Sequence, residues 1–175
     1  TETDTTVHWF LNGEDGYDKF SAVGYVFGTE LNDLYDVPIG LISADRGASK
    51  VEAWMSPEAL EAAGKSYGKT WYKGMIAPIQ RFPIKGVIWY QGEANAKSVN
   101  SATRYANTFK IHIQYWRDEW GYGDFPFLFV QLAGFGKGGY IDITWPVLRE
   151  SQNKALDLPN TATALAIDLG GNGIH

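Results

Sequence analysis

The stretch GVIWYQGEANA, residues 86–96, joins an apolar run to three polar side chains that surround a glycine. The run VIWY is typical of a buried β-strand, and Gln91, Glu93 and Asn95 follow it directly. A plain surface turn rarely needs a carboxylate and two amides so close to the end of a core strand. The stretch therefore predicts a strand that carries polar groups to a functional site. The alternative is a polar cap, in which Glu93 and Asn95 only satisfy the start of the next helix.

Helical and strand patterns alternate on both sides of this stretch. Apolar residues at steps of three and four predict helices over 17–35, 49–60, 69–82, 101–120 and 142–156. Apolar runs predict strands over 38–44, 84–90, 126–132 and 161–167. Strands that are apolar throughout and alternate with helices indicate a parallel sheet covered on both faces. We therefore predict an α/β fold, a three-layer sandwich with a mostly parallel sheet.

Polar, glycine-rich loops follow each predicted strand, at residues 45–49, 91–95, 133–136 and 168–175. Ligands of such sheets bind beyond the carboxyl ends of the strands. These loops bring amides, backbone N–H groups, a carboxylate and the terminal His175, a set that suits acyl transfer. In acyl transfer an imidazole moves protons while hydrogen-bond donors hold the oxyanion of a tetrahedral intermediate. None of the loops carries an obvious serine, threonine or cysteine nucleophile.

Composition narrows the classes of partner. A net charge of -5, with 15 Lys and Arg scattered along 175 residues, argues against nucleic acid. There are no cysteines, and the three histidines are too far apart in sequence to predict a metal site. No apolar run approaches the roughly 20 residues of a membrane span, and the first residues, TETDTTVHWF, are not a signal peptide. We interpret His112 as a boundary histidine of the long helix, without chemistry.

Four segments together resemble a known family. FSAVGYVFG (20–28), PIGLISADRGASKVEAW (38–54), GVIWYQGEAN (86–95) and IDLGGNGIH (167–175) are similar to successive blocks of the sialate O-acetylesterase family. That family belongs to the SGNH hydrolases and is related to acetylxylan esterases. The resemblance implies a flavodoxin-like α/β hydrolase that removes acetyl esters from a sugar or oligosaccharide, without a cofactor. A secreted or periplasmic location is favoured by the resemblance alone.

The resemblance also implies roles for individual residues. Gly47 matches the glycine whose N–H lies in the oxyanion hole, and Gln91 matches the side-chain donor, with Asn95 as the alternative. Glu93 supports this loop. His175 matches the catalytic histidine. Asn172 stands where many members carry an acid, so either Asp168 orients the histidine or a dyad operates.

The chain departs from the family pattern at its start. The Gly-Gln-Ser-Asn-like block that bears the nucleophilic serine is absent from these residues, and no closing helix follows His175. We therefore expect residues 1–16 to be a polar leader without an assigned place, and residues 17–175 to be a partial hydrolase domain. The serine would lie on a companion segment, and this chain alone would be inactive. Two alternatives remain: a noncatalytic carbohydrate-binding or scaffold module, and a glycosidase that uses Glu93 with Asp168.

Overall fold

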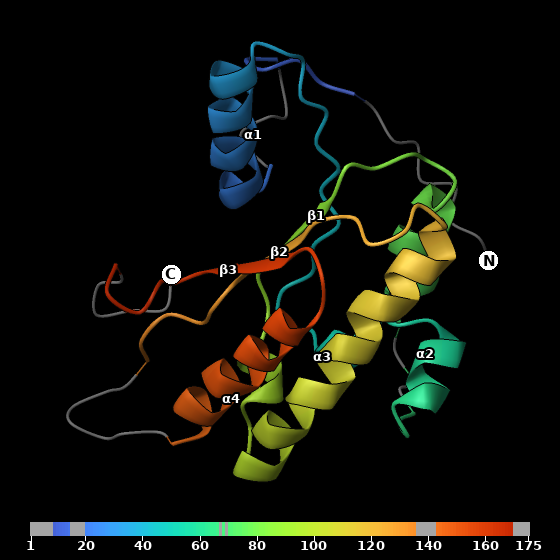
Figure 1. Cartoon of the computed structure of the whole chain (residues 1–175), viewed down its shortest axis with the longest axis vertical. Coiled ribbons are helices and arrows are strands. Elements are labelled where there is room, and N and C mark those ends of the chain that lie inside the picture. Colours follow the sequence, from blue (N-terminus) through green and yellow to red (C-terminus); the bar gives the residue numbers. More distant parts are fainter. Residues whose placement is uncertain (1–8, 15–19, 67, 69, 136–142, 170–175) are drawn as a thin grey trace. The chain divides into compact units, whose positions relative to one another are not determined.

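The computed structural model of the chain describes residues 9–14, 20–66, 68, 70–135 and 143–169 (Figure 1). The chain divides into two compact units, Thr1–Asp45 and Arg46–His175. The boundary predicted at residue 16, between a leader and a hydrolase domain, stays a prediction.

The first unit contains one helix, α1 (Ala22–Tyr35), among its described residues. The Oγ of Ser21 accepts a hydrogen bond from the N–H of Gly24 and so caps the first turn. The predicted helix is thereby confirmed over this range. The strand predicted over 38–44 is wrong, because these residues are assigned to no strand. An apolar, extended segment becomes a β-strand only when a neighbouring strand supplies ladder hydrogen bonds, and periodicity does not reveal that neighbour.

The second unit is built on a three-stranded sheet of β1 (Val87–Trp89), β2 (Phe127–Val130) and β3 (Thr161–Ala164). The strand order is β1-β2-β3, and both pairs are parallel. The predicted parallel sheet and these three strands are confirmed. Each strand is shorter than the apolar run that predicted it, because only part of each run lies beside a hydrogen-bonding neighbour.

Helices α3 (Val99–Trp120) and α4 (Thr144–Asn153) run beside this sheet (Figure 1). The stripe that predicted α3 is buried, and its Phe109 ring contacts those of Phe127 and Phe129. Ser98 caps the start of α3, and Gly121, with φ of 71°, ends it in the left-handed conformation that glycine adopts without strain. Helix α4 continues into a 3-10 turn, Lys154–Asp157. Both predicted helices are confirmed.

Two other predicted helices are interrupted by proline. The segment 49–60 forms a 3-10 turn, Val51–Trp54, and then a separate helix α2 (Pro57–Ala62) with Ser56 as its cap. The segment 69–82 forms a π-helix, Tyr72–Ile76, followed by a 3-10 turn, Ala77–Ile79. Proline lacks the N–H that a helix interior needs and fits best in a first turn, so each proline restarts the helix rather than continuing it.

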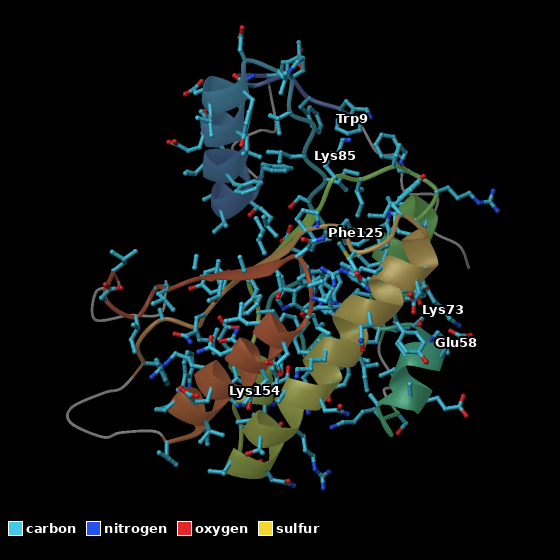
Figure 2. The ribbon with its side chains drawn as sticks, in the orientation of Figure 1. Trp9, Glu58, Lys73, Lys85, Phe125 and Lys154 are labelled. Carbon is cyan, nitrogen blue, oxygen red and sulfur yellow. The ribbon has the colours of Figure 1, made fainter. Side chains whose placement is uncertain are left out.

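Arg117 joins the end of α3 to the segments that lead into β2 and β3. Its buried guanidinium donates from Nη2 to the carbonyl oxygens of Phe125 and Pro159, both at 2.8 Å, and Phe125 is labelled in Figure 2. Its Nε also donates to Phe125 O, at 3.2 Å. One side chain therefore satisfies carbonyl groups from two chain segments that are distant in sequence.

Replacing Arg117 by Ala is expected to lower the free energy of unfolding by about 2 kcal/mol, because the carbonyl groups lose a charged donor and the aliphatic stem leaves a void. Urea denaturation measures this change. The matched control is Arg104→Ala, since Arg104 lies exposed on the same helix and its replacement should change stability by less than about 0.5 kcal/mol. Equal losses in the two variants would contradict the proposed importance of the buried hydrogen bonds.

His112 is fully buried, so its interpretation as a boundary histidine is wrong. Its ring lies 4.4 Å from that of Trp116 and 4.7 Å from that of Trp89, between centroids. Neither ring nitrogen has a hydrogen-bond partner in the described structure. Burial lowers the pKa of His112 to about 3, and the imidazole is therefore neutral in the folded protein near pH 7.

This burial predicts acid sensitivity. The pKa of His112 is about 3 in the folded chain and returns to about 6.5 on unfolding, so the unfolded chain binds the proton first as the pH falls. The free energy of unfolding therefore keeps its full value above pH 6.5. It falls by about 1.4 kcal/mol per pH unit between about pH 6.5 and pH 3. Between pH 7 and pH 5 the unfolding free energy should fall about 2 kcal/mol further in the wild type than in His112→Phe. Identical pH profiles from urea denaturation would refute this prediction.

Candidate functional site

The QGEAN motif lies directly beyond the carboxyl end of β1, where Glu93–Asn95 form a 3-10 turn. Helix α4 approaches the motif closely, since a Cβ added at Gly92 would lie 2.6 Å from Leu148 Cδ2. Any larger residue at this position would require the Leu148 side chain to move. Helix α3 is capped by Ser98, whose Oγ accepts from Ser101 N, so the alternative that Glu93 and Asn95 merely cap the next helix is wrong.

Gln91 is buried, and every polar group of its side chain is hydrogen-bonded. Its Nε2 donates to Ser49 O at 3.0 Å and to Asn95 Oδ1 at 2.9 Å. Its Oε1 accepts from the Tyr105 hydroxyl at 2.9 Å. Burial raises the pKa of the Tyr105 phenol well above its usual value, so Tyr105 is a neutral donor. The amide of Gln91 thus connects the motif to the loop before residue 50 and to helix α3.

Asn95 extends this connection to a buried carboxylate. Its Oδ1 also accepts from Val51 N at 3.0 Å, which fixes the orientation of the amide, and its Nδ2 donates to Glu52 Oε2 at 2.9 Å. The other oxygen of Glu52 lies 3.6 Å from Lys65 Nζ. A buried carboxylate needs such partners, because an unpaired charge in the interior is costly. The motif and residues 49–52, distant in sequence, therefore form one polar network.

Gly47 lies in an exposed turn at the start of this loop. A Cβ added at Gly47 would meet no atom within 4 Å, so the space around this backbone is open. The next residue, Ala48, has φ of 56°, a conformation that non-glycine residues seldom adopt and that is found at functional sites. Ser49 follows, and its carbonyl is the acceptor of Gln91 Nε2. The structure thus brings the loop of Gly47 beside the QGEAN motif.

Of the remaining predicted site residues, the structure describes Glu93 and Asp168. Glu93 is half-buried, and its Oε2 accepts from the N–H of Gly92 at 3.0 Å, a contact within its own loop. Asp168 is exposed on a turn after β3. His175 lies outside the described residues. Among the residues that are described, no group of three or more acidic or histidine side chains could hold a metal ion.

Sequence reasoning missed three members of the network: Glu52, Tyr105 and Gln152. Gln152 on α4 donates from Nε2 to Gln91 O at 3.1 Å and accepts from Leu132 N at 3.1 Å. A signal existed for Glu52, a lone carboxylate in the apolar run VEAWM. Gln152 lies four residues after the buried Leu148 on α4 and could have been assigned to the same inner face. Tyr105 gave no separate signal, because its place in the apolar stripe is also that of a core aromatic.

A parallel sheet with a buried polar network beyond the carboxyl end of a strand defines an α/β protein of the kind that binds ligands at this edge. A family model for "carbohydrate esterase, sialic acid-specific acetylesterase" matches residues 12–175. The chain belongs to this family.

Individual relatives agree with this assignment. The sialate O-acetylesterases of Homo sapiens and Pongo abelii are each 34% identical to the chain over 183 residues, covering 88% of it. That alignment covers 34% of each relative, so the chain spans about a third of their length.

Solved structures support the fold. A carbohydrate acetylesterase from Xanthomonas citri superposes with a TM-score of 0.79 at 44% identity, over 89% of this chain and 37% of that one. A protein from Arabidopsis thaliana superposes with a TM-score of 0.66 at 24% identity, and the match covers 85% of this chain and 57% of the Arabidopsis chain. This match shows a similar fold and nothing more. The predicted SGNH-type α/β class and the resemblance to sialate O-acetylesterases are confirmed.

Proposed function

We propose that this chain forms part of a carbohydrate O-acetylesterase that removes acetyl esters from sugars, on sialic acid or on a plant-type glycan. The observation that carries the proposal is the joining of the Gly47 loop to the QGEAN motif by Gln91, within a member of this esterase family. The resemblance to the family implies that both loops contribute donors to the oxyanion hole. A shared hydrogen-bond network is the rigid support that preorganised donors require.

The proposed reaction is serine-type acyl transfer. A serine on a companion segment attacks the acetyl carbonyl while His175 takes its proton, and the tetrahedral intermediate forms. The Gly47 N–H and an amide of Gln91 or Asn95 donate to the oxyanion. His175 then gives the proton to the sugar oxygen, which leaves. Water hydrolyses the acetyl-enzyme by the same steps, with Asp168 orienting His175 unless a dyad operates.

The geometry sets one condition on Gln91. Both hydrogens of its Nε2 are donated, to Ser49 O and Asn95 Oδ1. Direct donation to the oxyanion therefore requires Gln91 to release one of these partners. Alternatively, Gln91 keeps both partners and supports the oxyanion hole indirectly, by holding the Gly47 loop in place through Ser49 O. Asn95 is 2% exposed, and one hydrogen of its Nδ2 is donated to Glu52.

Ser49 is not proposed as the nucleophile, although it lies in this loop. Its Oγ donates to Arg46 O at 2.7 Å and accepts from Trp54 Nε1 at 2.9 Å. A nucleophilic hydroxyl gives its hydrogen to a general base, whereas this one gives it to a backbone carbonyl. This hydroxyl therefore has a structural contact in place of an activating one.

The test uses the longest natural form of the protein and an organophosphorus reagent that labels activated serines. We expect acetate release from acetylated sugars, and a labelled serine, found by peptide mass spectrometry, outside the 175 residues. The chain alone should release no acetate. Glycan binding without labelling or acetate release would refute the esterase and favour the noncatalytic carbohydrate-binding or scaffold module.

A further inference from the structure

The peptide bond between Arg46 and Gly47 is held by a hydrogen bond to its carbonyl group. Ser49 Oγ donates a hydrogen bond of 2.7 Å to the carbonyl oxygen of Arg46. This carbonyl and the N–H of Gly47 belong to one planar trans peptide, in which the two groups point in opposite directions. Fixing the carbonyl therefore also fixes the direction of the Gly47 N–H.

The hydroxyl of Ser49 is itself oriented. Trp54 Nε1 donates to Ser49 Oγ at 2.9 Å, which leaves the hydroxyl hydrogen to point at Arg46 O. Trp54 is buried in the 3-10 turn Val51–Trp54, and its own carbonyl accepts from Trp116 Nε1 at 3.0 Å. The direction of the hydroxyl is thus set from the core of the protein.

The side chain of Arg46 gives a second restraint. Its guanidinium carbon lies 5.3 Å from the ring centroid of Trp71, within the range of a cation–π contact. The backbone of Trp71 is held in turn, because its main-chain N–H donates to Ala53 O at 2.7 Å. Arg46 is exposed, and this contact therefore holds a side chain that would otherwise be free in solvent.

We propose that Ser49 is a positioning residue which, with Arg46 stacked on Trp71, aims the Gly47 N–H at the oxyanion of the acyl-transfer intermediate. This inference rests on the proposed esterase function. Donors that are already aimed before the reaction need no reorganisation when charge develops, which lowers the barrier and leaves ground-state binding unchanged. The left-handed Ala48 fits this view, because it is a local strain retained within the same short loop.

The experiment compares Ser49→Ala with Ser49→Thr in the serine-containing enzyme. Each is assayed with p-nitrophenyl acetate and with an acetylated sugar, and rates are divided by the concentration of active sites from organophosphate titration. We expect Ser49→Ala to lower kcat about 10-fold on both substrates with KM unchanged, and Ser49→Thr, which keeps the hydroxyl, to stay within about threefold of the wild type. Arg46→Ala should lower kcat about threefold to fivefold on both substrates. The control is Ser66→Ala, at an exposed serine outside the network, which should leave kcat unchanged.

Several results would overturn the inference. An unchanged kcat per active site in Ser49→Ala would do so, as would an equal loss in Ser49→Thr. A change confined to KM for the sugar would mean that the loop binds substrate instead of aiming a donor. These outcomes leave the esterase proposal intact, because the wild type remains active. Organophosphate labelling of Ser49 itself would overturn both proposals, and a wild type without acetylesterase activity would remove the basis of both.

Discussion

Replacing His175 by Ala in the serine-containing enzyme is expected to lower kcat for acetyl ester hydrolysis about 10³-fold, with KM nearly unchanged. The imidazole is assigned two proton transfers, one from the attacking serine and one to the departing sugar oxygen. Without it both must go to or from water, and this affects the transition state more than the bound substrate. Steady-state kinetics with p-nitrophenyl acetate and with an acetylated sugar measure the loss.

A comparison of the two substrates tests the second proton transfer separately, because the sugar is a poorer leaving group than p-nitrophenolate. p-Nitrophenolate departs without a proton, whereas a sugar hydroxyl needs one, so His175→Ala should affect the sugar ester more than the aryl ester. The control is His8→Ala, because His8 precedes the first residue of the family match at residue 12. A His175→Ala enzyme that keeps more than about a tenth of wild-type kcat would show that another group is the base.

Replacing Gln91 by Ala is expected to lower kcat about 10²-fold, while KM changes by less than about threefold. The variant removes the donor to Ser49 O and Asn95 Oδ1, and with it the hydrogen bonds that join the Gly47 loop to the QGEAN motif. Both proposed roles of Gln91 reduce oxyanion stabilisation, either directly or through the loop. A loss confined to KM would refute both roles.

A matched control exists on the neighbouring strand. Gln131 directly follows β2, is 7% exposed where Gln91 is 8% exposed, and donates to Asn153 Oδ1 at 3.1 Å. Gln131→Ala removes a buried amide of the same kind from the end of a parallel strand, outside the proposed oxyanion network. It should keep kcat within about threefold of the wild type. Equal losses in the two variants would indicate a general loss of folded protein, which urea denaturation would detect.

Local patterns in the sequence predicted the elements that depend on local interactions. The helix 101–120 was predicted from its apolar stripe and is found as Val99–Trp120. The three strands of the sheet were predicted from their apolar runs and the parallel pairing from their alternation with helices. Predictions failed where the outcome depended on something outside the segment. The strand over 38–44 had no ladder partner, and the prolines at 57 and 78 mark the places where helical periodicity restarts in a new turn.

Sequence patterns were sufficient to predict the α/β class, the family, and the position of the QGEAN motif at the end of a strand. These follow from periodicity and from the order of short motifs, both of which are local in the chain. The fold was needed to learn that Ser49, Asn95 and Tyr105 hold the side chain of Gln91, and that Glu52 accepts a hydrogen bond from Asn95. A buried amide takes whichever partners the fold places within about 3 Å, because leaving it unpaired is costly. Ser49 lies 42 residues from Gln91 and Glu52 lies 43 residues from Asn95, and no local pattern in the sequence predicts such pairings.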